Sequence, residues 1–129
     1  MMTIGKLAAA GGVGIETVRY YQRRGMLTEP ARGPGASVRR YSDADLRRLR
    51  FIRAAQGAGF TLNEIAELLE LHASDDRPRA RELAARRIAI IDAQIAELGR
   101  ARAALDQLAS RCAAGSAGPC PILNAFDAP

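Results

Sequence analysis

The sequence predicts an all-α protein with a small β wing, in which a winged helix-turn-helix domain precedes a long dimerisation helix that pairs as an antiparallel coiled coil. Hydrophobic residues make up 48% of the chain but aromatic residues only 5%, and tryptophan is absent. Such a composition favours helices built on Ala, Leu and Ile over β-sandwiches and barrels. The helical pattern is broken by a glycine pair near the N-terminus, and it runs with heptad spacing through residues 79–111.

Two short helices are expected first. Residues 3–10 carry apolar side chains at helical spacing, and Gly11-Gly12 interrupts the pattern. Residues 15–24 form the second predicted helix, which Gly25 ends. Two short helices joined by a tight glycine-containing turn are typical of a helix-turn-helix.

A wing and two further helices follow. Residues 28–41 are rich in Pro, Gly and Arg, which disfavours a helix and predicts a two-stranded hairpin or wing. Ser42 and Thr61 each begin a capping box, because Asp45 and Glu64 stand three residues later. Each box is followed by an apolar helical pattern.

The predicted domains follow from this order. The winged helix-turn-helix covers residues 1–72, a polar linker 73–78, the long helix 79–111, and a C-terminal metal-binding segment 112–129. A helix of about 33 residues is roughly 50 Å long, too long to bury its apolar stripe on so small a domain. Pairing with a second copy is therefore expected, and the alternative is a helix that folds back on its own domain. The predicted seam consists of Ala84, Ile88, Ile91, Ile95, Leu98, Arg102, Leu105 and Ala109.

Positive charge is concentrated in the first part of the chain. The whole chain has a net charge of +5, residues 1–53 hold eleven basic and four acidic side chains, and the remainder holds eight basic and ten acidic ones. A polyanionic partner for the first part explains this asymmetry, and so does a solvated arginine-rich surface.

The candidate DNA contacts lie on the second helix and the wing. Residues three or four apart share a helix face, so one exposed edge is expected to run from Thr17 through Tyr21 to Arg24. Ile15 and Val18 are expected to pack inward. Arginine suits guanine edges and phosphates, and hydroxyl groups suit phosphates. The predicted DNA-binding residues are Thr17, Arg19, Tyr20, Tyr21, Arg24, Arg39, Arg40 and Tyr41.

These segments resemble the MerR family of transcription regulators. The resemblance rests on residues 3–8, 12–27, 39–41, 48–52 and 59–65, and then on Cys112 and residues 120–123 beyond the long helix. It covers nearly the whole chain. Within the family, the second helix is most similar to that of the mercury-resistance regulators.

The resemblance implies a mechanism. A homodimer would bind double-stranded promoter DNA whose two polymerase elements are poorly spaced, acting as repressor or activator. Metal binding would bend and untwist the DNA, so that RNA polymerase could engage both elements. Such a deformation costs of order 1–10 kcal/mol, which protein contacts must offset.

Cys112 and Cys120 are the predicted metal ligands. Two facing thiolates form a soft site. Two-coordinate geometry suits Hg(II), Cu(I), Ag(I) or Au(I), and it is poor for Zn(II), which usually takes four ligands. Two incidental buried cysteines are the alternative.

Arg77 bears on which metal is bound. The resemblance implies that mercury sensors carry a third cysteine at the start of the long helix and that monovalent-metal sensors carry a serine, whereas Arg77 occupies the aligned position here. Hg(II) with two thiolates is neutral. A monovalent ion leaves a charge of −1, which the Arg77 guanidinium could offset. A solvated Arg77 in the linker, without a role in metal binding, is the alternative. Hg(II) is favoured narrowly, with Cu(I), Ag(I) or Au(I) as the alternative.

The two cysteines are also compatible with functions other than metal sensing. Cys112 and Cys120 could close a reversible disulfide in a thiol or redox sensor, aided by the positive charge of Arg77 and Arg111. A regulator that is independent of any inducer is a third hypothesis. A single histidine, His72, no clustered carboxylates and no phosphate-binding glycine loop argue against an enzyme. No signal peptide or membrane span is expected, which predicts a cytoplasmic protein with reduced thiols.

Overall fold

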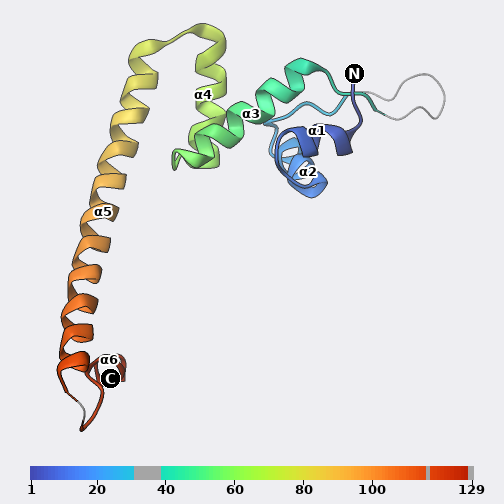
Figure 1. Cartoon of the computed structure of the whole chain (residues 1–129). Coiled ribbons are helices and arrows are strands. Elements are labelled where there is room, and N and C mark those ends of the chain that lie inside the picture. Colours follow the sequence, from blue (N-terminus) through green and yellow to red (C-terminus); the bar gives the residue numbers. More distant parts are fainter. Residues whose placement is uncertain (31–38, 116, 128–129) are drawn as a thin grey trace. The chain divides into compact units, whose positions relative to one another are not determined.

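The computed structural model describes residues 1–30, 39–115 and 117–127 of the chain (Figure 1). The chain forms two compact units, Met1–Leu83 and Ala84–Pro129. The helices are α1 (Ile4–Ala10), α2 (Ile15–Arg23), α3 (Asp43–Gly57), α4 (Leu62–Ser74), α5 (Arg77–Ala114) and α6 (Pro121–Phe126). The predominantly helical fold predicted from the sequence is therefore confirmed.

Only the two ends of the predicted β wing, residues 28–30 and 39–41, lie within the described part of the chain. Met2 and Tyr41 form an isolated antiparallel bridge, in which each backbone N–H donates to the other residue's carbonyl at 2.8 Å. No other β pairing occurs among residues 1–30, 39–115 and 117–127. Most of the predicted hairpin falls on residues 31–38, which lie outside the described part of the chain.

Local hydrogen bonds begin the helices where the sequence predicts. The backbone N–H of Ser42 donates to Asp45 Oδ2 at 2.7 Å, and that of Thr61 donates to Glu64 Oε1 at 2.8 Å. Both capping boxes are complete, since the hydroxyl of each first residue also accepts from the N–H of the acidic one. These reciprocal bonds satisfy backbone N–H groups that would otherwise lack a helical partner.

The core of the first unit is apolar and joins α1 to α4. Val18 packs inward as predicted and is fully buried, but Ile15 is 41% exposed. Ile15 is the first residue of α2, whereas the buried Val18 lies nearly one turn further along the helix. The buried cluster is Leu7, Ala8, Val18, Tyr21, Met26, Leu27, Tyr41, Leu49, Ile52, Ile65 and Leu69.

The break between α4 and α5 is shorter than the predicted linker 73–78. Helix α4 continues to Ser74, and α5 already begins at Arg77. Asp75 supplies the turn with φ 54° and ψ 41°, a left-handed conformation that aspartate tolerates better than most residues. Pro78 does not interrupt α5, because the first turn of a helix needs no N–H from it.

Charged side chains hold the start of α5 against α4. Arg79 donates to both carboxylate oxygens of Glu67 at 2.6 and 2.9 Å, and it also pairs with Glu82 at 3.1 Å. The backbone N–H of Arg79 donates to Asp76 Oδ1 at 3.2 Å. A bidentate arginine–carboxylate pair has a defined geometry, so it fixes the first turn of α5 against α4 within the first unit.

The close approach of α1 to α3 is the basis of a stability test. A Cβ on Gly11 would lie 2.3 Å from Cδ2 of Leu49, whose side chain is fully buried. We expect Gly11→Ala to lower the free energy of unfolding by about 1–3 kcal/mol through overpacking. A Cβ on Gly57, the last residue of α3, meets no atom within 4 Å. Gly57→Ala should therefore raise the free energy of unfolding by roughly 0.4–1 kcal/mol.

Urea unfolding followed by circular dichroism measures both variants. Because each variant adds one methyl group to a glycine, their comparison isolates the contact with Leu49. Equal effects of the two substitutions would contradict the described packing of α1 on α3.

Candidate nucleic-acid interface and thiol pair

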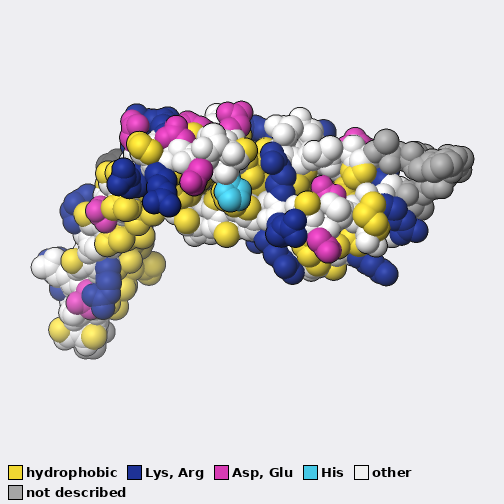
Figure 2. All heavy atoms as spheres, turned by 90° about the horizontal axis from the view of Figure 1, so that it is seen from above, with side chains coloured by type: hydrophobic (Ala, Val, Ile, Leu, Met, Phe, Trp, Pro, Cys, Tyr) yellow, Lys and Arg dark blue, Asp and Glu magenta, His cyan; other side chains and the backbone are white. Residues whose placement is uncertain are grey.

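The outer face of α2 carries a basic and aromatic cluster. Arg19, Tyr20 and Arg23 are exposed, and Thr17 is half-buried. The guanidinium carbon of Arg23 lies 5.9 Å from the centre of the Tyr20 ring, within the range of a cation–π contact. Arg23 is absent from the predicted site, although its spacing of three residues from Tyr20 and four from Arg19 could have identified it. Figure 2 shows Lys and Arg side chains in several separate groups on the visible face.

The prediction that Tyr21 lies on the exposed edge is wrong. Its side chain is 2% exposed, and its hydroxyl donates to Gln56 Oε1 of α3 at 2.5 Å. Tyr21 stands three residues after the buried Val18, and this places both on the inner face of α2. Tyr21 therefore ties α2 to α3.

Tyr41 is also buried, contrary to the expectation of an exposed wing residue. It is 3% exposed, and its hydroxyl accepts a hydrogen bond from Gln22 Nε2 at 2.9 Å. Its backbone forms the bridge to Met2. Tyr41 thus anchors the segment that leads into α3. Next to it, Arg40 is exposed and available to a partner.

The other two predicted arginines make contacts within the chain. Arg39 is half-buried and forms an ion pair with Glu29, with 3.3 Å between Nε and Oε1. Arg24 is exposed, and its Nη2 donates to Asn63 Oδ1 at the start of α4, at 3.0 Å. These contacts orient the two guanidinium groups, each of which has further N–H donors for a phosphate.

Cys112 and Cys120 face each other at the end of the second unit. Cys112 lies in the last turns of α5, and Cys120 is the N-cap of α6, which lies beside that end of α5 in Figure 1. The two sulfur atoms are 3.5 Å apart, and both thiols are half-buried. Gly118, with φ 89°, provides a turn in the intervening loop that most residues would adopt only with strain. The sequence places the two cysteines correctly as a pair.

The two thiols have different electrostatic surroundings. The backbone N–H of Leu123 at the start of α6, followed by the Cys112 thiol, lowers the pKa of Cys120, although the Cys120 sulfur makes no helix-capping hydrogen bond of standard geometry. The hydrogen bond shared with Cys120 raises the pKa of Cys112. Cys120 is thus the first of the pair to form a thiolate, the form that binds a metal.

The pair fits a soft metal ion better than a zinc ion. Among residues 1–30, 39–115 and 117–127, no three His, Cys, Asp or Glu side chains come together in a metal-binding arrangement. One chain therefore offers two sulfur ligands, whereas zinc usually takes four ligands. With metal–sulfur bonds of about 2.3 Å, two sulfurs in linear coordination are about 4.6 Å apart, so the pair must open by roughly 1 Å to bind an ion linearly.

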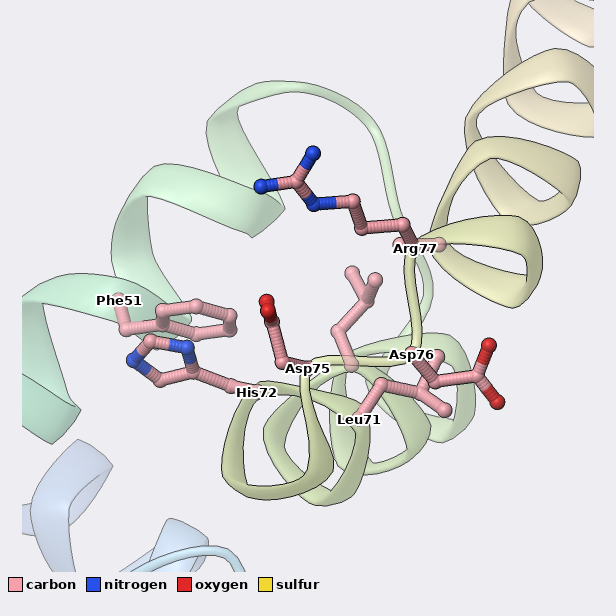
Figure 3. A pocket seen from close by; sticks show the side chains of 8 residues that line it. Phe51, Leu71, His72, Asp75, Asp76 and Arg77 are labelled. Carbon is pink, nitrogen blue, oxygen red and sulfur yellow. The ribbon is translucent and has the colours of Figure 1, made fainter.

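Arg77 and His72 belong to the first unit. They line a small pocket with Phe51 and Asp75 (Figure 3). His72 lies on helix α4, and its ring stacks on that of Phe51 with 5.5 Å between the ring centroids. Arg77 is exposed as the first residue of α5. Cys112 belongs to the second unit and lies in the last turns of α5.

Large apolar side chains are exposed along α5. Ile88 is 57% exposed, Ile95 62%, Leu98 70% and Leu105 47%. All four belong to the predicted heptad seam. In the described part of the chain no helix combines the length and apolar character needed to cross a membrane.

Comparison with known proteins agrees with this arrangement. Residues 2–71 match the MerR HTH family of regulatory proteins, and residues 46–108 match the family described as MerR, DNA binding. The chain is 42% identical over 123 residues to the mercuric resistance operon regulatory protein of Pseudomonas fluorescens, a match that covers 95% of this chain and 85% of the relative.

Two solved structures of metal complexes are also similar. The lead(II) complex of the regulator PbrR691 from Ralstonia metallidurans CH34 matches with a TM-score of 0.76 and 34% identity, over 98% of this chain and 99% of that one. The mercury(II) complex of MerR from Bacillus megaterium MB1 matches with a TM-score of 0.69 and 32% identity, over 97% and 98% of the two chains. The chain belongs to the MerR family of helix-turn-helix transcription regulators.

Proposed function

We propose that this chain acts as a homodimeric regulator that binds promoter DNA through its first unit and a soft metal ion through Cys112 and Cys120. The observation that carries the proposal is the pair of sulfur atoms 3.5 Å apart, in a chain 42% identical to a mercuric resistance regulator. A pair of thiols at the end of a long helix has no need of such closeness for packing alone.

The DNA-binding surface that we propose is centred on α2. Arg19, Tyr20 and Arg23 reach solvent on the face opposite the buried Val18 and Tyr21. Guanidinium groups contact phosphates and guanine edges, and the tyrosine hydroxyl can donate to a phosphate. The full proposed set adds Thr17, Arg24, Arg39 and Arg40. Tyr21 and Tyr41 support this surface from the core.

Dimerisation explains the exposed apolar side of α5. Burying an exposed Ile or Leu side chain stabilises a complex by about 1.5–3 kcal/mol before the entropic cost of association. In an antiparallel pair of α5 helices, the start of one helix lies near the end of the other. The partner's Arg77 would then approach Cys112 and Cys120, which the Arg77 of the same chain does not contact.

Mercury(II) is the metal that we favour. Two thiolates balance the charge of Hg(II), so a half-buried site needs no further counterion. The similarity to a mercuric resistance regulator and to a mercury complex supports this choice. A site for Cu(I), Ag(I) or Au(I) is the second candidate, because Arg77 is a cation that could balance the remaining negative charge.

Metal binding would act on DNA through α5. The metal would fix the separation of Cys112 and Cys120 and hence the position of α6 against the end of α5. In the dimer, this change reaches the start of the partner's α5, which its Arg79–Glu67 pair holds against α4. The two DNA-binding units would then be held differently, which would distort the promoter for RNA polymerase.

Removing one proposed phosphate contact tests the DNA-binding surface. We expect Arg19→Ala to weaken promoter binding and to reduce the slope of log affinity against log salt by about 0.9 per subunit. Arg100→Ala removes the same charge from α5 and should leave the slope unchanged. Fluorescence anisotropy at several salt concentrations measures both variants, and a slope that responds equally to both would argue against a surface on α2.

Removing one thiol tests the metal site. We expect Cys112→Ser and Cys120→Ser each to abolish the Hg(II) response of the promoter complex, because one sulfur cannot form the two-coordinate site. Both variants should still bind DNA, because the cysteines lie outside the first unit. Competitive titration on promoter DNA with Hg(II), Cu(I), Ag(I), Au(I), Pb(II), Cd(II) and Zn(II) gives the selectivity. A Cys120→Ser variant that retains a full Hg(II) response would overturn the site.

Replacing Arg77 distinguishes the two candidate metals. If the ion is monovalent, Arg77→Ala should lower Ag(I) affinity roughly tenfold, equivalent to about 1.4 kcal/mol, because a negative charge would lose its counterion. Hg(II) affinity should change little, since its complex with two thiolates is neutral. Equal losses for Ag(I) and Hg(II) would mean that Arg77 supports the structure of the site and does not balance its charge.

A further inference from the structure

The apolar seam of α5 is interrupted by one charged residue. Arg102 occupies a seam position between Leu98 and Leu105, all on α5. The structure has a shallow groove at this point, lined by Leu98, Ala101, Arg102, Leu105, Asp106 and Ala109. A guanidinium group in an apolar interface is costly unless a carboxylate lies close to it.

The spacing of the seam determines how two copies can pair. In heptad notation, Ile88, Ile95, Arg102 and Ala109 take position a, while Ala84, Ile91, Leu98 and Leu105 take position d. In an antiparallel coiled coil, each a residue lies opposite a d residue of the other helix. One register uses all eight residues. Its pairs are Ile95 with the partner's Leu98, Ile88 with the partner's Leu105, Arg102 with the partner's Ile91, and Ala109 with the partner's Ala84.

This register places a carboxylate beside Arg102. Asp92 follows Ile91 at position e, which neighbours position a around the helix. The two-fold axis between antiparallel helices keeps the a and e positions of both helices on the same edge of the interface. In this register, Arg102 would therefore lie next to the partner's Asp92. Asp106, one turn further along the same helix, adds a second acidic side chain on that edge.

The opposite orientation lacks this compensation. In a parallel pair in register, Arg102 would face the partner's Arg102, and two like charges would share an apolar layer. A charged residue at one a position is known to select orientation and register in this way. We propose that Arg102 and Asp92 form two symmetry-related ion pairs across the dimer and thereby fix its antiparallel direction and register. This inference rests on the dimer of the proposed function and goes beyond it by naming the residues that choose its geometry.

Charge reversal with rescue tests the pair. Arg102→Glu should raise the dimer dissociation constant roughly tenfold or more, because two carboxylates would then meet at each site. Adding Asp92→Arg should restore dimerisation by recreating the pair with reversed charges. Arg100→Glu is the matched control, since it makes the same change at position f, away from the seam. Sedimentation equilibrium measures the constants for the full-length chain, and anisotropy on promoter DNA is measured alongside.

The outcomes separate this proposal from the function. The ion pair is wrong if the wild-type chain dimerises and binds DNA but Arg102→Glu and Arg100→Glu raise its dimer dissociation constant equally. It is also wrong if adding Asp92→Arg to Arg102→Glu does not restore dimerisation. In both cases the proposed function stands. If the wild-type chain neither dimerises nor binds DNA, the proposed function is wrong, and the ion pair that rests on it is wrong as well.

Cross-linking provides a second test that does not depend on affinity. In a Cys112→Ser/Cys120→Ser background, Ala84→Cys with Ala109→Cys should form intermolecular disulfides on mild oxidation, and each single cysteine should not. Efficient cross-linking of Ala84→Cys alone would indicate a parallel pair and would overturn the proposal.

Discussion

The exposed apolar side of helix α5 is the constraint on which the rest of this protein depends. The helix spans Arg77–Ala114, and four large side chains of its seam are each close to half exposed or more. A small first unit cannot cover a stripe of that length. A second copy of the same helix offers a stripe of the same length, apolar except at Arg102. Pairing would therefore stabilise the long helix and relate the two DNA-binding units by two-fold symmetry.

Helix α5 also connects the DNA-binding unit to the thiol pair. Its first turn is held to the DNA-binding unit by the Arg79–Glu67 pair, and its last turns carry Cys112. A thiol site placed there can act on DNA only if the helix transmits a change of position. The proposed antiparallel pairing would shorten this route, because it would bring the thiols of one chain towards the first helical turn of the other. Arg102 would preserve that arrangement against the parallel alternative.

The sequence predicts the helices better than it predicts the functional surface. Caps at Ser42 and Thr61 and the heptads of α5 are local patterns, and they identify elements without tertiary information. Tyr21 and Tyr41 could not be assigned in that way. An amphipathic tyrosine suits both a core and a phosphate, and only the positions of Gln56 and Gln22 show which role is taken. The linker was predicted too long because single aspartates in a left-handed turn leave little trace in a sequence pattern.

The oligomeric state tests the central claim most directly. Sedimentation equilibrium of the full-length chain at micromolar concentration, with its thiols kept reduced, gives the mass without assumptions about shape. The account predicts a mass twice that of the 13.8 kDa chain, with or without metal. A folded species with the mass of a single chain would contradict it, because the exposed seam of α5 would then need another explanation.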